Sequence, residues 1–201
     1  RGGRGEVYAA RNRGTGRSVA LKIIRSAEVS DELRRRFLRE AKAATAISHP
    51  NVIDVLDVFE DEDGSPVMVM ELLEGEPLSA LLKGERRPEL GQIAAILLPV
   101  ARALQEAHDK GIVHRDLKPD NIFLGCATGG ALVPKLLDFG IAKVLDPASV
   151  SETQGSQTST GSILGTPQYM SFEQAMSEKD IDHRADIWAF GVILFEAVTG
   201  R

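Results

Sequence analysis

The residues that could do chemistry gather in one short stretch, His114–Asn121, which reads His-Arg-Asp-Leu-Lys-Pro-Asp-Asn. Pro119 cannot sit inside a regular helix, and it pushes Lys118 towards extended backbone. The stretch is therefore predicted to be a loop of fixed shape. Asp116 and Asn121 offer a carboxylate beside a carboxamide, which suits a site that accepts a proton and holds a hard cation through oxygen. A polar turn that caps a helix is the alternative interpretation of this stretch taken alone.

A second pair of charges lies upstream in apolar surroundings. Lys22 falls in the strand-like run Ser18–Ile24, where a cation is costly unless it is paired. Glu40 falls on the apolar face of Ser30–Ile47, which has helical spacing. We therefore expect Lys22 to pair with Glu40, the alternative being an edge-strand lysine that faces solvent. The apolar face consists of Phe37, Ala41, Ala44 and Ile47.

The elements that must position these groups can be predicted from turn signals and apolar spacing. They are a hairpin of Val7–Arg11 and Ser18–Ile24, strands Val52–Glu60 and Pro66–Leu73, a helix Leu90–Lys110 closed by Gly111, a hairpin of Ile122–Leu124 and Val133–Leu137, and a helix Asp182–Thr199. The last helix is apolar nearly all round, which is typical of a buried helix. The mixture predicts an α+β fold.

Composition limits the function classes. The chain has 201 residues and a net charge of −5, which argues against a nucleic-acid-binding protein. Its single cysteine, Cys126, excludes an internal disulfide and fits a reducing compartment, so we expect a cytoplasmic domain. No apolar run reaches the ~20 residues that span a bilayer, and no signal peptide opens the chain. The chain begins within a motif and ends within a helix, so it is interpreted as a fragment, with any membrane anchor outside it.

Five motifs in order carry a resemblance to a known family. They are a glycine-rich loop in Arg1–Tyr8, Val19-Ala20-Leu21-Lys22, the stretch His114–Asn121, Asp138-Phe139-Gly140, and Gly165-Thr166-Pro167-Gln168-Tyr169-Met170. The chain resembles a eukaryotic-type, or Hanks-type, serine/threonine protein kinase of the kind widespread in bacteria. The resemblance implies a two-lobed fold, with a small antiparallel β N-lobe at 1–70, a hinge at 71–76 and a helical C-lobe, incomplete here, at 77–201. Because this fragment lacks the helices that usually cover the last helix, we expect that helix to expose an apolar face.

The resemblance also implies roles for individual residues. The expected activity is transfer of the γ-phosphoryl group of ATP to protein Ser or Thr hydroxyls. The implied catalytic residues are Asp116, Lys118, Lys22 and Glu40. The implied ATP contacts are Gly2, Gly5, Val7, Ala20, Lys22, Met70, Glu71, Leu73, Phe123 and Leu137. The implied ligands of Mg²⁺, with Mn²⁺ as an alternative, are Asn121 and Asp138.

The run Ile141–Gly165 is rich in hydroxyl side chains and poor in apolar ones. It is interpreted as an activation loop that is ordered by phosphorylation, with Thr158 and Thr160 as the preferred sites and Arg115 as the group that receives the phosphate. A disordered linker is the alternative. By resemblance, His114–Asn121 is the catalytic loop, and Thr166, Glu173 and Asp186 dock the substrate or support this loop.

The chain departs from the family pattern at two places. Ala44 stands where a larger apolar residue is usual, and Ser171-Phe172-Glu173 replaces Ala-Pro-Glu. These departures keep a pseudokinase, a nucleotide-binding scaffold on the same fold, open as an alternative. A small-molecule phosphotransferase is a more distant one. The expected partners are ATP, protein substrates and a second copy of the chain for trans-autophosphorylation.

Overall fold

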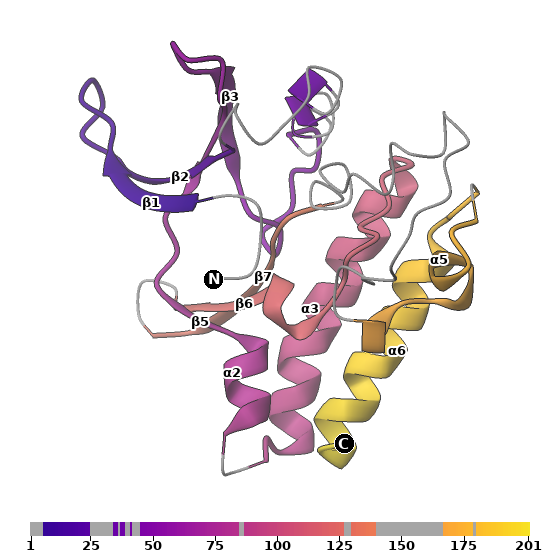
Figure 1. Ribbon diagram of the computed structural model, residues 1–201. Coiled ribbons are helices and arrows are strands. Elements are labelled where there is room, and N and C mark those ends of the chain that lie inside the picture. The colour runs from indigo at the N-terminus through magenta and orange to yellow at the C-terminus, as the bar shows by residue number, and fades with distance from the viewer. Residues whose placement is uncertain are drawn as a thin grey trace.

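The computed structural model describes residues 6–24, 34–35, 37–38, 41, 45–84, 87–126, 130–139, 167–178 and 180–201. It contains two antiparallel sheets, with most of the helices beside the second one (Figure 1). The first sheet has the order β1-β2-β4-β3 and consists of β1 (Glu6–Arg11), β2 (Ser18–Ile23), β3 (Val55–Glu60) and β4 (Pro66–Glu71). The second has the order β5-β6-β7 and consists of β5 (Gly75–Pro77), β6 (Ile122–Cys126) and β7 (Leu132–Leu136). The helices are α2 (Leu78–Lys83), α3 (Leu90–Asp109), α5 (Phe172–Ala175) and α6 (Arg184–Thr199). The predicted two-lobed α+β fold is confirmed.

The turn between β1 and β2 shows how local chemistry sets the first hairpin. The side chain of Asn12 accepts hydrogen bonds from the amides of Gly14 at 3.0 Å and Thr15 at 2.9 Å. Gly16 then closes the turn with a φ of 72°, a conformation that glycine adopts without steric cost. The predicted hairpin is confirmed, with β2 ending at Ile23.

Several predicted boundaries differ from those in the structure, and two of the differences affect how the elements connect. The third strand begins at Val55 rather than Val52, because Val52 instead forms a parallel bridge with Leu136 of the second sheet. The amide of Ile53 also donates to the carbonyl of Leu136 at 2.9 Å, so this segment ties the two sheets together. Thr45 and Ala46 lie in a turn, so the helix predicted for Ser30–Ile47 does not reach its expected end. The residues of that helix that the structure describes as helical are Arg34, Arg35, Phe37, Leu38 and Ala41.

Helix α3 is the central element of the C-lobe. The five residues predicted to face inward are all buried: Ile93, Ile96, Leu97, Val100 and Leu104. Gln92 and Glu89 form a capping box at its start, and Gly111, with a φ of 72°, follows its end as predicted. Pro99 lies inside this helix. The chain leaves α3 directly into the stretch that carries the candidate catalytic groups.

Helix α6 packs beside α3 (Figure 1), and part of its apolar surface is exposed, as the sequence predicts. Its buried face consists of Ala185, Asp186, Ala189, Ile193 and Ala197. Its large apolar residues Ile187, Trp188, Leu194, Phe195 and Val198 are exposed. Three of the five buried residues are alanines, whose small side chains permit close approach of the backbones. Among the described residues, no helix combines the length and the apolar character needed to cross a membrane.

Gly75 is the position in the sheets where a side chain is least tolerable. It has a φ of 146°, and a Cβ built on it would lie 2.1 Å from the carbonyl oxygen of Leu124. We expect Gly75→Ala to lower the free energy of unfolding by about 2–3 kcal/mol, because backbone atoms of β6 would have to move. Gly91→Ala, in helix α3 with nothing within 4 Å of the added Cβ, is the matched control and should be neutral or slightly stabilising. Urea unfolding of both variants checks this, and equal midpoints would contradict it.

Candidate active site

The catalytic loop connects α3 to β6, and its backbone has the fixed shape that the sequence predicts. Lys118 is extended, with φ −159° and ψ 164°, and Pro119–Asn121 forms a single 3₁₀ turn. His114 is fully buried, and its Nε2 lies 2.8 Å from the carbonyl oxygen of Leu137. Its ring also lies against that of Phe139, with 4.8 Å between ring centroids. The loop is therefore anchored to the segment that follows β7.

Asp116 has two partners from its own loop. The ammonium of Lys118 lies 2.7 Å from Oδ2 of Asp116. The side-chain amide of Asn121 donates to the backbone oxygen of Asp116 at 2.7 Å and to Oδ2 at 3.1 Å. The Asp116 side chain keeps 17% of its accessible surface, so it is not sealed from solvent. Asp116, Lys118 and Asn121 form the cluster that the motif predicts.

Lys22 and Asp138 bridge the two sheets. The Lys22 ammonium lies 2.6 Å from Oδ1 of Asp138, and their side chains are 14% and 29% exposed. Asp138 has a φ of 53°, in the left-handed region that aspartate tolerates better than most residues. The amide of Leu137 donates to the carbonyl of Asn121 at 2.9 Å. Asp138 therefore comes directly after a residue that is hydrogen-bonded to Asn121. The side chains of Asp138 and Asn121 thus start from neighbouring backbone positions.

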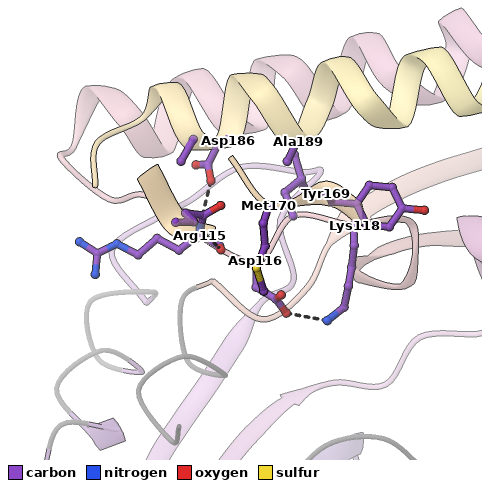
Figure 2. A pocket seen from close by; sticks show the side chains of 10 residues that line it. Arg115, Asp116, Lys118, Tyr169, Met170, Asp186 and Ala189 are labelled. Carbon is purple, nitrogen blue, oxygen red and sulfur yellow. Dashed lines mark hydrogen bonds and ion pairs between the residues drawn. The ribbon is translucent and has the colours of Figure 1, made fainter. Parts of the chain in front are cut away.

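Asp186 of helix α6 holds the catalytic loop by its backbone. Its carboxylate accepts hydrogen bonds from the amides of His114 and Arg115, both at 2.8 Å, and lies 2.7 Å from Nε2 of His108. Burial alone would raise the pKa of this carboxyl, but the His108 hydrogen bond, the charge of His114 and the two amides outweigh it and hold the pKa below its ordinary value. These hydrogen bonds to the backbone of the loop are consistent with the supporting role predicted for Asp186. Figure 2 shows Asp186 above the loop, with Asp116 and Lys118 pointing together to the other side.

The adenine contacts implied by resemblance fall into two groups on the two sheets. In the first sheet, Val7 pairs with Lys22 and Ala20 pairs with Met70. Ala20 and Met70 are buried, whereas Val7 is 62% exposed. Phe123, on β6 opposite Pro77, and Leu137, which follows β7, are half-buried beside the second sheet. The link between the sheets includes Leu72 and Leu73, as the expected hinge does.

Sequence reasoning missed a contact that fixes the start of this link. Lys135 of β7 forms an ion pair with Glu71, the last residue of β4, and its ammonium also lies 3.4 Å from the carbonyl of Val52. Glu71 further accepts a hydrogen bond from the amide of Asp54 at 2.8 Å. A lysine next to apolar strand residues gives no sign of a partner 64 positions away. The side chain of Glu71 thus binds both sheets.

Sequence reasoning also missed Gln174. This residue is 9% exposed, and its amide nitrogen donates to the carbonyl of Arg115 at 2.7 Å. Its amide oxygen accepts from the backbone of Ser171 at 3.2 Å, which completes a capping box for α5. The spacing of Ser171 and Gln174 is the sequence signal that could have found the cap. Ser171 begins this helix in extended conformation and Phe172 takes the first helical position, so the turn forms without the usual proline.

Some of the predicted site residues lie outside the described part of the chain. They are Gly2, Gly5, Glu40, Thr158, Thr160 and Thr166, together with Gly140 and the departure at Ala44. The expected pair of Lys22 and Glu40 and the activation loop therefore stay predictions. Glu173 is described and half-buried in α5.

A metal site made by protein groups alone is not found among the described residues, which contain no group of three or more His, Cys, Asp or Glu side chains suited to a metal. Asn121 and Asp138 supply two oxygen-bearing groups from adjoining segments. Such a set fits Mg²⁺, which is usually held by one or two carboxylates together with substrate phosphates and water.

Comparison with known proteins decides the family. The protein kinase domain family matches the chain over residues 1–201. The chain belongs to this family. The kinase domain is 42% identical over 200 residues to the serine/threonine-protein kinase Pkn3 of Myxococcus xanthus, covering 99% of this chain and 36% of that protein. It is 40% identical over 205 residues to the serine/threonine-protein kinase PknA of Mycobacterium tuberculosis, covering 100% of this chain and 45% of the relative.

A solved structure agrees with these relatives. The crystal structure of a double mutant of the Mycobacterium tuberculosis PknI kinase domain superimposes with a TM-score of 0.74 at 30% identity, covering 98% of this chain and 68% of the other. The chain spans 36% and 45% of the length of these two curated relatives. These comparisons establish a kinase domain of the bacterial serine/threonine type, a family that uses ATP and a divalent metal ion.

Proposed function

We propose that the protein transfers the γ-phosphoryl group of ATP to serine or threonine hydroxyls of other proteins. The observation that carries this proposal is the cluster of Asp116, Lys118 and Asn121, joined by hydrogen bonds, near the bridge between Lys22 and Asp138. A proton acceptor, phosphate-binding cations and metal-binding oxygens are the groups that phosphoryl transfer requires.

The reaction divides between these groups as follows. Asp116 orients the substrate hydroxyl and takes its proton as the oxygen bonds to the γ-phosphorus, and the bond from that phosphorus to the β–γ bridging oxygen breaks to release ADP. Lys118, 2.7 Å from Asp116, steadies the γ-phosphoryl group. Lys22 binds the α- and β-phosphates, held by Glu40 as the family pattern implies. Mg²⁺, or Mn²⁺, held by Asn121 and Asp138, would neutralise phosphate charge.

The nucleotide base is assigned to the space beside the link between the sheets. Backbone groups at Glu71 and Leu73 would bind the adenine edge, with Met70 behind it. The ion pair of Glu71 with Lys135 supports this assignment, because it fixes where the link starts. The lobes are proposed at 1–70 and 77–201, with the hinge at 71–76 between them. The glycines at 2 and 5 would approach the phosphates.

A transfer assay in the full-length protein tests the proposal. ATP labelled in the γ-phosphate is supplied with Mg²⁺ and a mixture of protein substrates. We expect label on serine or threonine, and none with the Lys22→Met protein as the negative control. Nucleotide binding without transfer in the wild-type protein would refute the activity and favour a pseudokinase.

We further propose that phosphorylation at Thr158 or Thr160 activates the protein and that one copy phosphorylates another. Arg115 supports this, because its guanidinium makes no ion pair with any other residue that the structure describes, and Figure 2 shows it pointing away from Asp116 and Asp186. Added phosphate would give it a partner. Incubation of the Lys22→Met protein with a wild-type copy should place phosphate between Ser149 and Thr166 of the inactive copy, as read by mass spectrometry. An active protein without phosphate there would contradict this.

A further inference from the structure

Arg115, the residue before the proposed catalytic base, has a strained backbone. Its φ is 63°, in the left-handed region that costs a residue with a side chain free energy and persists only where the surroundings enforce it. The two peptide groups of Arg115 set the backbone direction at Asp116 and so the direction of the Asp116 side chain. The amide of Asp116 donates to the carbonyl of His114 at 2.8 Å. The orientation of the Asp116 carboxylate therefore depends on what holds Arg115.

Arg115 is held at both its backbone polar groups. Its amide donates to Oδ1 of Asp186 at 2.8 Å, and its carbonyl accepts from Nε2 of Gln174 at 2.7 Å. The first contact comes from helix α6 and the second from α5. Figure 2 shows the first of these contacts, from Asp186 down to the backbone of Arg115. Loss of either contact would leave one buried polar group without its partner and release part of the constraint.

The carboxamide of Gln174 can take only one orientation here. Its oxygen faces the amide of Ser171 at 3.2 Å and the Ser171 hydroxyl at 3.4 Å, while its nitrogen faces the carbonyl of Arg115. Rotation by half a turn would place two acceptors against each other and two donors against each other. Gln174 is 9% exposed, so solvent offers little replacement for these contacts.

The segment 167–178, which contains Gln174, is also anchored to helix α6. The hydroxyl of Tyr169 donates to Oε2 of Glu196 on α6 at 2.6 Å, and burial together with Glu196 raises the pKa of that hydroxyl. Residues 167–178 are thus held to α6 by Tyr169 and to the catalytic loop by Gln174. This segment begins directly after Thr166, which by resemblance docks the substrate.

From this geometry we propose that Gln174 is a positioning residue for phosphoryl transfer. Its side-chain amide keeps the carbonyl of Arg115 in place and so couples the substrate-side segment to the orientation of Asp116. The inference rests on the proposed function, since it needs Asp116 to be the base. It differs from a role in capping α5, which uses only the oxygen of the carboxamide.

Two variants separate positioning from capping. Gln174→Glu retains an acceptor for Ser171, as glutamate is a common capping-box residue, but has no donor for Arg115 at pH 8, where it is ionised. Gln174→Leu removes both contacts with little change in size. In the full-length protein we expect both variants to lower kcat about tenfold to a hundredfold, with the KM for ATP within about twofold of wild type. Gln92→Glu is the matched control, because Gln92 caps α3 in the same way but is exposed, and its kcat should not change.

The outcomes distinguish the two proposals. Wild-type kcat in Gln174→Glu would reduce Gln174 to a helix cap and overturn the inference while leaving the kinase activity intact. Loss of nucleotide binding in both variants would also overturn the inference. The carboxamide of Gln174 would then stabilise the fold as a whole rather than the orientation of Asp116. Absence of transfer by the wild-type protein itself would instead refute the proposed function.

Discussion

Asp116→Ala in the full-length protein is expected to lower kcat for phosphoryl transfer about a thousandfold. General base catalysis contributes about 10² to 10⁴ to a rate, and the carboxylate also orients the attacking hydroxyl. The alanine variant leaves the Lys118 ammonium without the partner that lies 2.7 Å away. Lys118 can then move, so the γ-phosphoryl group loses part of its stabilisation as well.

Nucleotide binding separates this result from unfolding. The proposed base contacts neither the adenine nor the α- and β-phosphates, so the Kd for ATP should stay within about threefold of wild type when measured by calorimetry. Asp109→Ala removes a carboxylate from the exposed end of α3 and serves as the control with unchanged kcat. A kcat for Asp116→Ala within tenfold of wild type would remove Asp116 from the role of base, whatever the protein's substrate.

The polar groups of the site were largely predictable because their types and spacing are dictated by chemistry. The loop His114–Asn121 contains its own cluster, so the contacts of Asp116 with Lys118 and Asn121 follow from local sequence. The turn at Asn12 and the end of α3 at Gly111 were predictable for the same reason, since each depends on residues within a few positions.

Contacts between distant segments were harder to predict. The ion pair of Lys135 with Glu71 joins strands of different sheets, and the bond of Gln174 to the carbonyl of Arg115 joins α5 to the catalytic loop. Neither contact is recognisable from the neighbouring sequence. Many acidic side chains could have paired with Lys135, and the backbone carbonyl of any residue could have accepted the hydrogen bond from Gln174. Only the three-dimensional arrangement selects it.

The buried face of α6 could not be identified from composition alone. Several large apolar residues of this helix are exposed, and its buried face consists of three alanines, one isoleucine and one carboxylate. The sequence predicts an exposed apolar face on this helix, but not which side chains form it. The structure places Ala185 and Ala189 near the loop, which lets the Asp186 carboxylate reach the amides of His114 and Arg115.

Asp186→Asn is expected to be the most destabilising of the conservative changes proposed for this site. An asparagine offers one oxygen and one NH₂ group where the carboxylate offers two acceptors. One oxygen of Asp186 binds the amide of Arg115, and the other binds the amide of His114 and faces His108. Whichever way the amide is turned, at least one buried donor loses its acceptor. We expect the free energy of unfolding at pH 7 to fall by about 3 kcal/mol.

The pH dependence of this effect has a definite sign. The pKa of Asp186 is lowered in the folded state, because its hydrogen bonds and the neighbouring charge outweigh the effect of burial. The stability that the charged carboxylate contributes is therefore fully present above the unfolded-state pKa, about 3.9, and is lost as pH falls through the lower folded-state pKa. The gap in urea midpoint between wild type and Asp186→Asn should be widest near pH 7 and should shrink below about pH 4. Asp182→Asn, at an ion pair with Arg184 whose side chains are 44% and 76% exposed, should change the midpoint little at any pH. A gap that stays constant or widens on acidification would show that the charge of Asp186 does not hold the catalytic loop.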